Sequence, residues 1–137
     1  MEVLELTAED DVSATALWAE NGLTRPWNDP AADFLRAIEG ATSAVLGIKR
    51  SGELIGTVMV GNDGHRGWVY YLAIDRSHQR VGIGSELMRA AEEWLRGKGA
   101  VKVQLMVRRD NDAALEFYDR VGYETNDVKV LSRWLEG

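Results

Sequence analysis

The sequence predicts an α/β (α+β) domain with a mixed, mostly antiparallel sheet and helices on both of its faces. Three strand patterns follow one another between residues 43 and 74, as in an antiparallel meander. After residue 80, helix patterns alternate with single strands, which favours crossovers over the sheet. Residues 68–74 are apolar or aromatic throughout, as in a strand buried on both faces. The expected order is β-α-α-β-β-β-α-β-α-β.

The first half of this order begins with residues 3–6, which alternate like a strand. Thr7 followed by Asp10 indicates a helix start, and that helix reaches about Glu20. Asp29 is suited to cap a second helix that has Pro30 at its first position and runs to Glu39. We expect strands at 43–49, 54–60 and 68–74, the first two joined by a short turn that contains a glycine.

The second half begins with a helix over residues 84–96, whose apolar residues recur at helical spacing and which the glycines at 97 and 99 end. A strand at 101–107 follows. Asn111 is suited to cap another helix, which ends at Gly122, and residues 128–134 predict a last strand.

The composition limits the classes of function. The 137 residues predict a single domain, 1–137, and 16 basic against 22 acidic residues give a net charge of −6, which disfavours nucleic acid and anionic membranes. The chain has no cysteine and only two histidines, so we expect no disulfide, cysteine nucleophile or metal centre. No signal peptide or membrane span is expected, and we anticipate a cytoplasmic monomer or homodimer.

A glycine-bearing loop at residues 74–85 is the most informative segment. Gly82 and Gly84 at a helix start let consecutive backbone N–H groups converge on phosphate oxygens, with Arg76 and Arg80 adding positive charge. A tight strand-to-helix turn without a ligand is the alternative. Leu87 stands where a dinucleotide fold needs a small residue, and the Gly-Lys-Ser or Gly-Lys-Thr of a P-loop is absent.

Two motifs resemble the GCN5-related N-acetyltransferase (GNAT) family. The segment Gln79-Arg80-Val81-Gly82-Ile83-Gly84 is similar to that family's coenzyme A pyrophosphate loop, and residues 111–123 are similar to its Asn-x-x-Ala-x-x-hydrophobic-Tyr-x-x-x-Gly-Phe or Tyr element. The order of strands also matches, which implies a GNAT-like fold. Residues 25–30 and 63–67 further resemble the YpeA-type group of bacterial acetyltransferases.

The resemblance implies an acetyl-CoA-dependent N-acetyltransferase without a metal. Its acceptor would be a primary amine of a small molecule, or a lysine or N-terminal amine of a peptide or protein, attacking directly in a ternary complex. A noncatalytic acyl-CoA-binding or sensing module is the alternative. By resemblance, the cofactor-binding residues are Leu72, Ala73, Ile74, Gln79, Arg80, Val81, Gly82, Ile83, Gly84, Ser85, Asn111 and Tyr118.

Tyr118 and Ile74 are the expected catalytic residues by resemblance. Tyr118 would stand at the sulfur, where a thiol pKa of about 8.5 against about 10 for tyrosine leaves both proton transfer and hydrogen bonding open. A core aromatic is the structural alternative for Tyr118. The backbone N–H of Ile74 would stabilise the oxyanion. Met106 occupies the position of a glutamate in ribosomal-protein N-terminal alanine acetyltransferases, which puts that substrate and that base in doubt.

Candidate acceptor-binding residues lie in two turns. Arg25, Trp27 and Asn28 connect the first two expected helices and either wall the acceptor pocket or simply pin the connection. Asp63 and His65 precede the central strand and either supply a water-linked base or only shape a turn.

Overall fold

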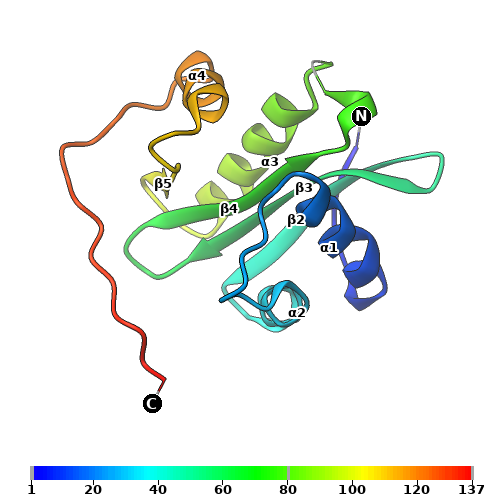
Figure 1. Cartoon of the computed structure of the whole chain (residues 1–137), viewed down its shortest axis with the longest axis horizontal. Coiled ribbons are helices and arrows are strands. Elements are labelled where there is room, and N and C mark those ends of the chain that lie inside the picture. Colours follow the sequence, from blue (N-terminus) through cyan, green and yellow to red (C-terminus); the bar gives the residue numbers. More distant parts are fainter. Residues whose placement is uncertain (1, 80, 137) are drawn as a thin grey trace. The chain divides into compact units, whose positions relative to one another are not determined.

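The computed structural model describes residues 2–79 and 81–136. The chain divides into two compact units, residues 1–106 and residues 107–137. Of the elements in the described residues, the first unit carries the five strands and three of the α-helices (Figure 1). Its elements are β1 (Val3–Glu5), a 3-10 turn (Ala8–Asp10), α1 (Asp11–Glu20), α2 (Pro30–Glu39), β2 (Ser43–Arg50), β3 (Glu53–Asn62), β4 (Gly67–Ile74), a 3-10 turn (Arg76–His78), α3 (Ile83–Gly97) and β5 (Val103–Leu105). The second unit carries α4 (Asp112–Arg120).

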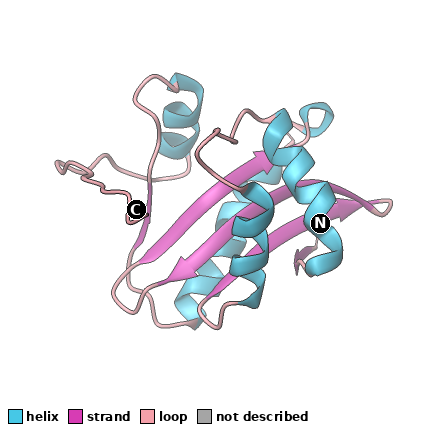
Figure 2. Ribbon diagram, turned by 60° about the horizontal axis from the view of Figure 1, so that its bottom comes forward, coloured by secondary structure: helices cyan, strands magenta, loops and turns pink. Residues whose placement is uncertain are grey.

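The sheet has five strands in the order β1-β2-β3-β4-β5, antiparallel except for the parallel pair β4–β5. Thr57 of β3 bonds to Trp18 of α1, whereas a Cβ on its neighbour Gly56 would meet side chains of α3. Because adjacent strand residues point to opposite faces, α1 and α3 lie on opposite faces, as Figure 2 shows. The predicted mixed sheet with helices on both faces is confirmed.

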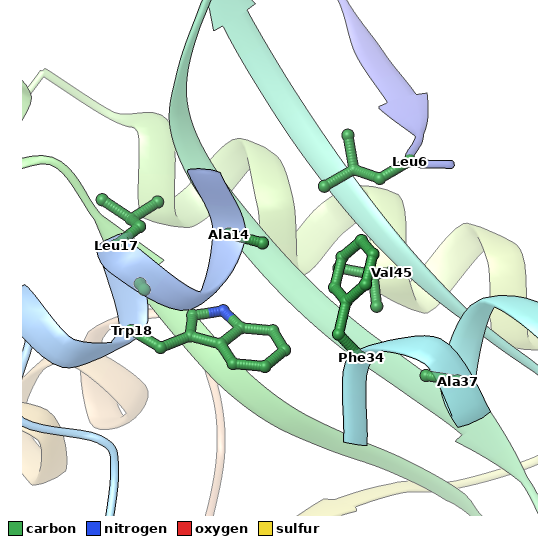
Figure 3. Packing of buried hydrophobic residues seen from close by; sticks show 8 residues of the cluster. Leu6, Ala14, Leu17, Trp18, Phe34, Ala37 and Val45 are labelled. Carbon is green, nitrogen blue, oxygen red and sulfur yellow. The ribbon is translucent and has the colours of Figure 1, made fainter. Parts of the chain in front are cut away.

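Helices α1 and α2 bury their apolar faces in one cluster on the sheet (Figure 3). Trp18 and Phe34 are fully buried, with ring centroids 6.0 Å apart, and pack with Val45 of β2. The Asp29 side chain accepts from the Ala32 N–H at 3.1 Å, so α2 begins with the predicted cap. Burial of these two large aromatic side chains fixes both helices against the sheet.

Strand β4 contains a bulge in the middle of the sheet. Tyr70 pairs with Met59 and Ala73 pairs with Thr57, so two residues of β4, Tyr71 and Leu72, lie opposite one residue of β3. Tyr71 has a φ of 52°, a left-handed conformation that a bulky side chain rarely adopts. The fold must therefore hold this conformation by other contacts.

A buried polar network supplies these contacts. Thr57 is a fully buried polar residue, and its hydroxyl donates to the Tyr71 carbonyl at 3.0 Å while it accepts from the Trp18 indole N–H at 2.9 Å. The Tyr71 ring stacks on Trp18 with centroids 3.8 Å apart. The bulge is thus fixed through both its backbone and its side chain.

The predicted last strand is absent. The described residues 121–136 form no strand, although four of the seven residues 128–134 are apolar. Val130, Leu131 and Trp134 are exposed by 69%, 89% and 68%. A strand requires hydrogen bonds from a neighbouring backbone, which the pattern of one segment cannot guarantee. The strand predicted at 101–107 is likewise shorter and pairs with β4 over only three residues.

We expect the Thr57 hydroxyl to contribute strongly to stability. Thr57→Val preserves the side-chain volume but leaves the Trp18 N–H and the Tyr71 carbonyl without their partner, at a cost of about 1–3 kcal/mol for each. Thr57→Ser keeps the hydroxyl and loses one buried methyl, worth about 1 kcal/mol. Urea unfolding followed by tryptophan fluorescence should rank the valine variant below the serine variant, and the reverse ranking would contradict the network.

Candidate active site

The loop between β4 and α3 ends in a helix start with open backbone donors. Gly82 precedes the helix with a φ of 84° and no side-chain cap, and the Glu86 N–H bonds to the Gly82 carbonyl at 3.1 Å. The N–H groups of residues 83–85 consequently lack partners within the helix. A Cβ on Gly82 would meet nothing within 4 Å, so glycine is needed there for its conformation and not for space. This arrangement is suited to an anion.

Hydrogen bonds fix the first part of this loop. Asp75 bonds to His78 Nδ1 at 2.7 Å and accepts from the Ser77 hydroxyl at 3.1 Å, and these two contacts hold the Asp75 pKa below its usual value. Gln79 donates to the Ile74 carbonyl at 3.3 Å. The Arg76 guanidinium donates to the Glu20 carbonyl at 2.9 Å and so braces the end of α1. Arg80 lies outside the described residues.

The far end of β4 has an open edge. Its ladder with β5 covers residues 67–69 only, so among the described strands none pairs with that edge beyond Val69. The Asp75 N–H donates to the Ile55 carbonyl of β3 at 2.8 Å. Because ladder positions alternate, the preceding N–H, that of Ile74, points away from β3 toward the open edge. This edge can pair with an extended amide-bearing ligand.

A cavity of about 600 Å³ lies on the α2 side of the sheet. Its walls include Leu23, Met59, Tyr70 and Tyr71, with Asn28 among its polar lining. Asn28 is the sequence-predicted acceptor residue that contributes to this cavity. The volume is typical of a small-molecule site.

Sequence reasoning missed the charged pair in this cavity. Asp33 accepts from the Tyr71 hydroxyl at 2.8 Å and pairs with Arg36 at 2.7 Å. The Tyr71 pKa is raised, mainly by burial and secondly by the hydrogen bond to Asp33. The phenol therefore remains a donor at neutral pH. An aspartate in the first turn of a helix ordinarily indicates only a favourable interaction with the helix dipole, so no sequence signal pointed to this contact.

Two other predicted acceptor residues take different positions. The Arg25 guanidinium donates to the carbonyls of Gly22 and Thr24 at 2.8 and 3.0 Å, so it braces its own connection. Trp27 is 58% exposed. The connection is thus held by local hydrogen bonds, and Asn28 is the part of it that reaches the cavity.

Asp63 organises the turn before β4. Its Oδ1 accepts from the N–H groups of Arg66 and His65 at 2.7 and 2.8 Å, and its Oδ2 accepts from the Trp68 indole at 3.3 Å. The two backbone N–H groups, with Arg66 having the larger effect, hold the Asp63 pKa below its usual value. His65 is exposed, with Nδ1 3.4 Å from the Arg66 guanidinium. This geometry gives Asp63 a structural part in the turn.

The second unit contains Asn111 and Tyr118. The Asn111 side chain accepts from the Ala114 N–H at 3.2 Å and caps α4 as predicted. The half-buried Tyr118 ring packs edge-on against Phe117 and Tyr123, with centroids 5.1 and 5.8 Å away. Desolvation raises the Tyr118 pKa to about 12, so its hydroxyl keeps its proton well above neutral pH.

Comparison with known proteins identifies the family. An uncapped helix start beside an open strand edge is suited to bind an elongated anionic cofactor. The sequence model of the acetyltransferase (GNAT) family matches residues 6–123, so the chain belongs to this family of acetyltransferases.

Solved structures share the fold at low sequence identity. The aminoglycoside acetyltransferase AAC(6')-Iy, bound to a CoA bisubstrate analogue, is 13% identical with a TM-score of 0.83, and 97% of each chain is covered. A ribosomal-protein-alanine N-acetyltransferase from Brucella melitensis is 18% identical with a TM-score of 0.77, over 97% of this chain and 98% of that one. An aminoglycoside acetyltransferase from an uncultured soil metagenomic sample is 18% identical with a TM-score of 0.80, over 99% and 96%.

The described residues show neither a metal-binding cluster nor a membrane-spanning helix. Within residues 2–79 and 81–136, no group of three or more histidine, cysteine, aspartate or glutamate side chains is placed to hold a metal ion. In the same part of the chain, no helix is both long and apolar enough to cross a membrane.

The Tyr118 pKa predicts a spectroscopic result. Between pH 10 and 12 the folded protein keeps the Tyr118 proton, whereas the unfolded chain loses it. The contribution of Tyr118 to the free energy of unfolding is therefore complete below pH 10 and is lost as the pH rises through 12. At pH 10.5, folded wild type and Tyr118→Phe should show equal phenolate absorbance at 295 nm.

Unfolding in guanidinium provides the control for this measurement. All four tyrosines of the wild type then titrate near pH 10, so the variant should lose about one quarter of the signal. If the folded Tyr118→Phe variant at pH 10.5 showed less absorbance than the folded wild type by the amount that one tyrosine contributes in guanidinium, Tyr118 would have an ordinary pKa.

Proposed function

We propose that the protein is an acetyl-CoA-dependent N-acetyltransferase that transfers the acetyl group to a primary amine in a ternary complex. The observation that carries this proposal is the open β4 edge followed in the chain by the uncapped start of α3. These two backbone surfaces suit the two parts of coenzyme A, an amide-bearing arm and a pyrophosphate.

The cofactor contacts follow from this match. The backbone of Leu72, Ala73 and Ile74 pairs with the pantetheine amides. The N–H groups of the loop and first helical turn, from Val81 to Ser85, hold the pyrophosphate, and the family pattern adds Gln79 and Arg80. Because the Asn111 side-chain oxygen caps α4, a contact of this residue with the cofactor would come from its amide nitrogen or its backbone.

The reaction needs no covalent intermediate. The neutral amine attacks the thioester carbonyl carbon, so a C–N bond forms, the C–S bond breaks, and the amine loses one proton to water. The Ile74 N–H, directed toward the open edge, stabilises the oxyanion. Holding both substrates together supplies much of the acceleration.

We assign to Tyr118 a hydrogen bond to the departing thiolate. Proton transfer from a phenol of pKa about 12 to a thiolate whose acid has a pKa of about 8.5 would be uphill by about 5 kcal/mol. A hydrogen bond to the same sulfur carries no such penalty. The raised pKa therefore supports the hydrogen-bonding role over formal acid catalysis.

We place the amine acceptor in the cavity that Asn28 helps to line. We place the protein in the YpeA-type group of this family and expect it to act in the cytoplasm, where acetyl-CoA is available, as a monomer or homodimer. The exposed Met106 offers no general base, which supports an acceptor other than a ribosomal N-terminal alanine.

Tyr118→Phe should lower kcat about 10–100-fold, the value of one hydrogen bond to a charged group, and leave the acetyl-CoA Kd within about twofold. Thiol release and calorimetry measure the two quantities. Tyr123→Phe is the control, because the family motif accepts either residue there, and it should retain full turnover. An unchanged kcat in Tyr118→Phe, with a working acceptor, would remove the proposed role.

Gly82→Ala should raise the acetyl-CoA Kd about tenfold. An alanine at a φ of 84° costs about 1–2 kcal/mol and displaces the amides of the helix start. Gly97→Ala, at the other end of the same helix and with nothing within 4 Å of the added Cβ, should leave the Kd unchanged. Equal affinities of the two variants would argue against pyrophosphate binding at residue 82. Tight binding without thiol release from any amine would instead favour a noncatalytic acyl-CoA sensor.

A further inference from the structure

The charge of the cavity beside α2 is already compensated within the protein. Among the described residues that line it, Asp33 and Arg36 are the charged ones, and they pair at 2.7 Å. The second carboxylate oxygen of Asp33 accepts from the Tyr71 hydroxyl at 2.8 Å. The cavity therefore presents no net negative charge to an incoming ligand.

The remaining walls are mostly apolar and held in place. Tyr71 is stacked on Trp18 and belongs to the bulge of β4, so its ring is fixed before any ligand arrives. Tyr70 pairs across the strands with Met59 and stacks with Trp68, at a centroid distance of 6.5 Å. A preformed cavity with aromatic and thioether walls favours a ligand with an apolar, ring-sized body.

We propose that this cavity selects a primary monoamine carried on such an apolar body and rejects polycations. This inference rests on the proposed acetyltransferase function and names its class of acceptor. A polyamine or an aminoglycoside would bring several ammonium groups into a site whose single carboxylate is already paired. Each additional ammonium would lose its hydration without gaining a counterion.

The same walls favour the reactive form of a monoamine. An amine must be neutral before it can attack the thioester, and an ammonium of ordinary pKa near 10.4 is mostly charged at neutral pH. Apolar surroundings disfavour the charged form and lower the amine pKa. A cavity without an available carboxylate therefore promotes deprotonation, which a cavity built to bind ammonium groups would oppose.

Two probes separate these classes: 2-phenylethylamine as the apolar monoamine and spermidine as the polycation. Thiol release from saturating acetyl-CoA at constant ionic strength gives kcat/KM for each. We expect 2-phenylethylamine to be preferred at least tenfold by the wild type. A preference for spermidine, or equal values, would overturn the inference while leaving the acetyltransferase function established.

Arg36→Gln tests the assigned cause. Arg36 is 72% exposed in its side chain, so its replacement should not disturb the core, and it releases the Asp33 charge into the cavity. The preference for 2-phenylethylamine should fall at least fivefold, because spermidine carries more positive charge and gains more from that carboxylate. Asp33→Asn should raise the preference.

Arg96→Gln is the matched control. Arg96 also pairs with an acidic residue three positions earlier on a helix, Glu93, but lies in α3 and does not line the cavity. Its preference should equal that of the wild type. An unchanged preference in Arg36→Gln, or an equal change in Arg96→Gln, would contradict the role of the Asp33–Arg36 pair.

A separate measurement distinguishes this inference from the proposed function. Should no amine be acetylated, calorimetric titration of the protein with each probe still tests the cavity. Binding of 2-phenylethylamine at least tenfold tighter than spermidine supports the inference even then. Binding of neither probe, or tighter binding of spermidine, overturns it, whereas failure of acetyl-CoA to bind overturns the proposed function.

Discussion

The bulge of β4 is the constraint on which the site of the first unit depends. An extra residue in this strand shifts the ladder register, forces Tyr71 to a φ of 52° and alters which backbone groups face the edge away from β3. The conformation persists because Thr57 and Trp18 hold the Tyr71 backbone and ring. One buried threonine hydroxyl thereby links helix α1 to the geometry of the candidate cofactor strand. Strain of this kind is sustained only where the surrounding packing determines it.

The same bulge connects the open edge of β4 to the cavity. The Tyr71 hydroxyl donates to Asp33 of α2, so the strained residue of the strand also holds the carboxylate whose charge Arg36 compensates in the cavity. The candidate cofactor strand and the cavity wall are therefore joined by the contacts of one residue within the first unit. A rigid arrangement suits a transfer reaction, in which two substrates must be held in a fixed relation while a bond passes between them.

Several features were predictable because their causes are local in the chain. The start of α2 follows from Asp29 and Pro30, and the left-handed residue before α3 follows from Gly82. The meander and the place of β4 inside the sheet follow from hydrophobic patterning, but the prediction that residues 68–74 are buried on both faces is wrong, because Tyr70 is exposed and four other residues of this strand are only partly buried. The predicted strand at 128–134 is wrong because a strand also requires a partner backbone, which its own pattern does not specify.

By itself, the sequence determined the order of the helices and of the first five strands, the glycine loop and the motifs that indicate a GNAT acetyltransferase, since each depends on residues close together in the chain. Only the tertiary structure decided the contact of Tyr71 with Asp33, the bond from the Arg76 guanidinium to the end of α1, and the neutral balance of the cavity. Tyr71 and Asp33 are separated by 38 residues, and Arg76 and Glu20 by 56. Groups so far apart in the chain meet only when the sheet and its bulge bring them together, and no local pattern encodes that register.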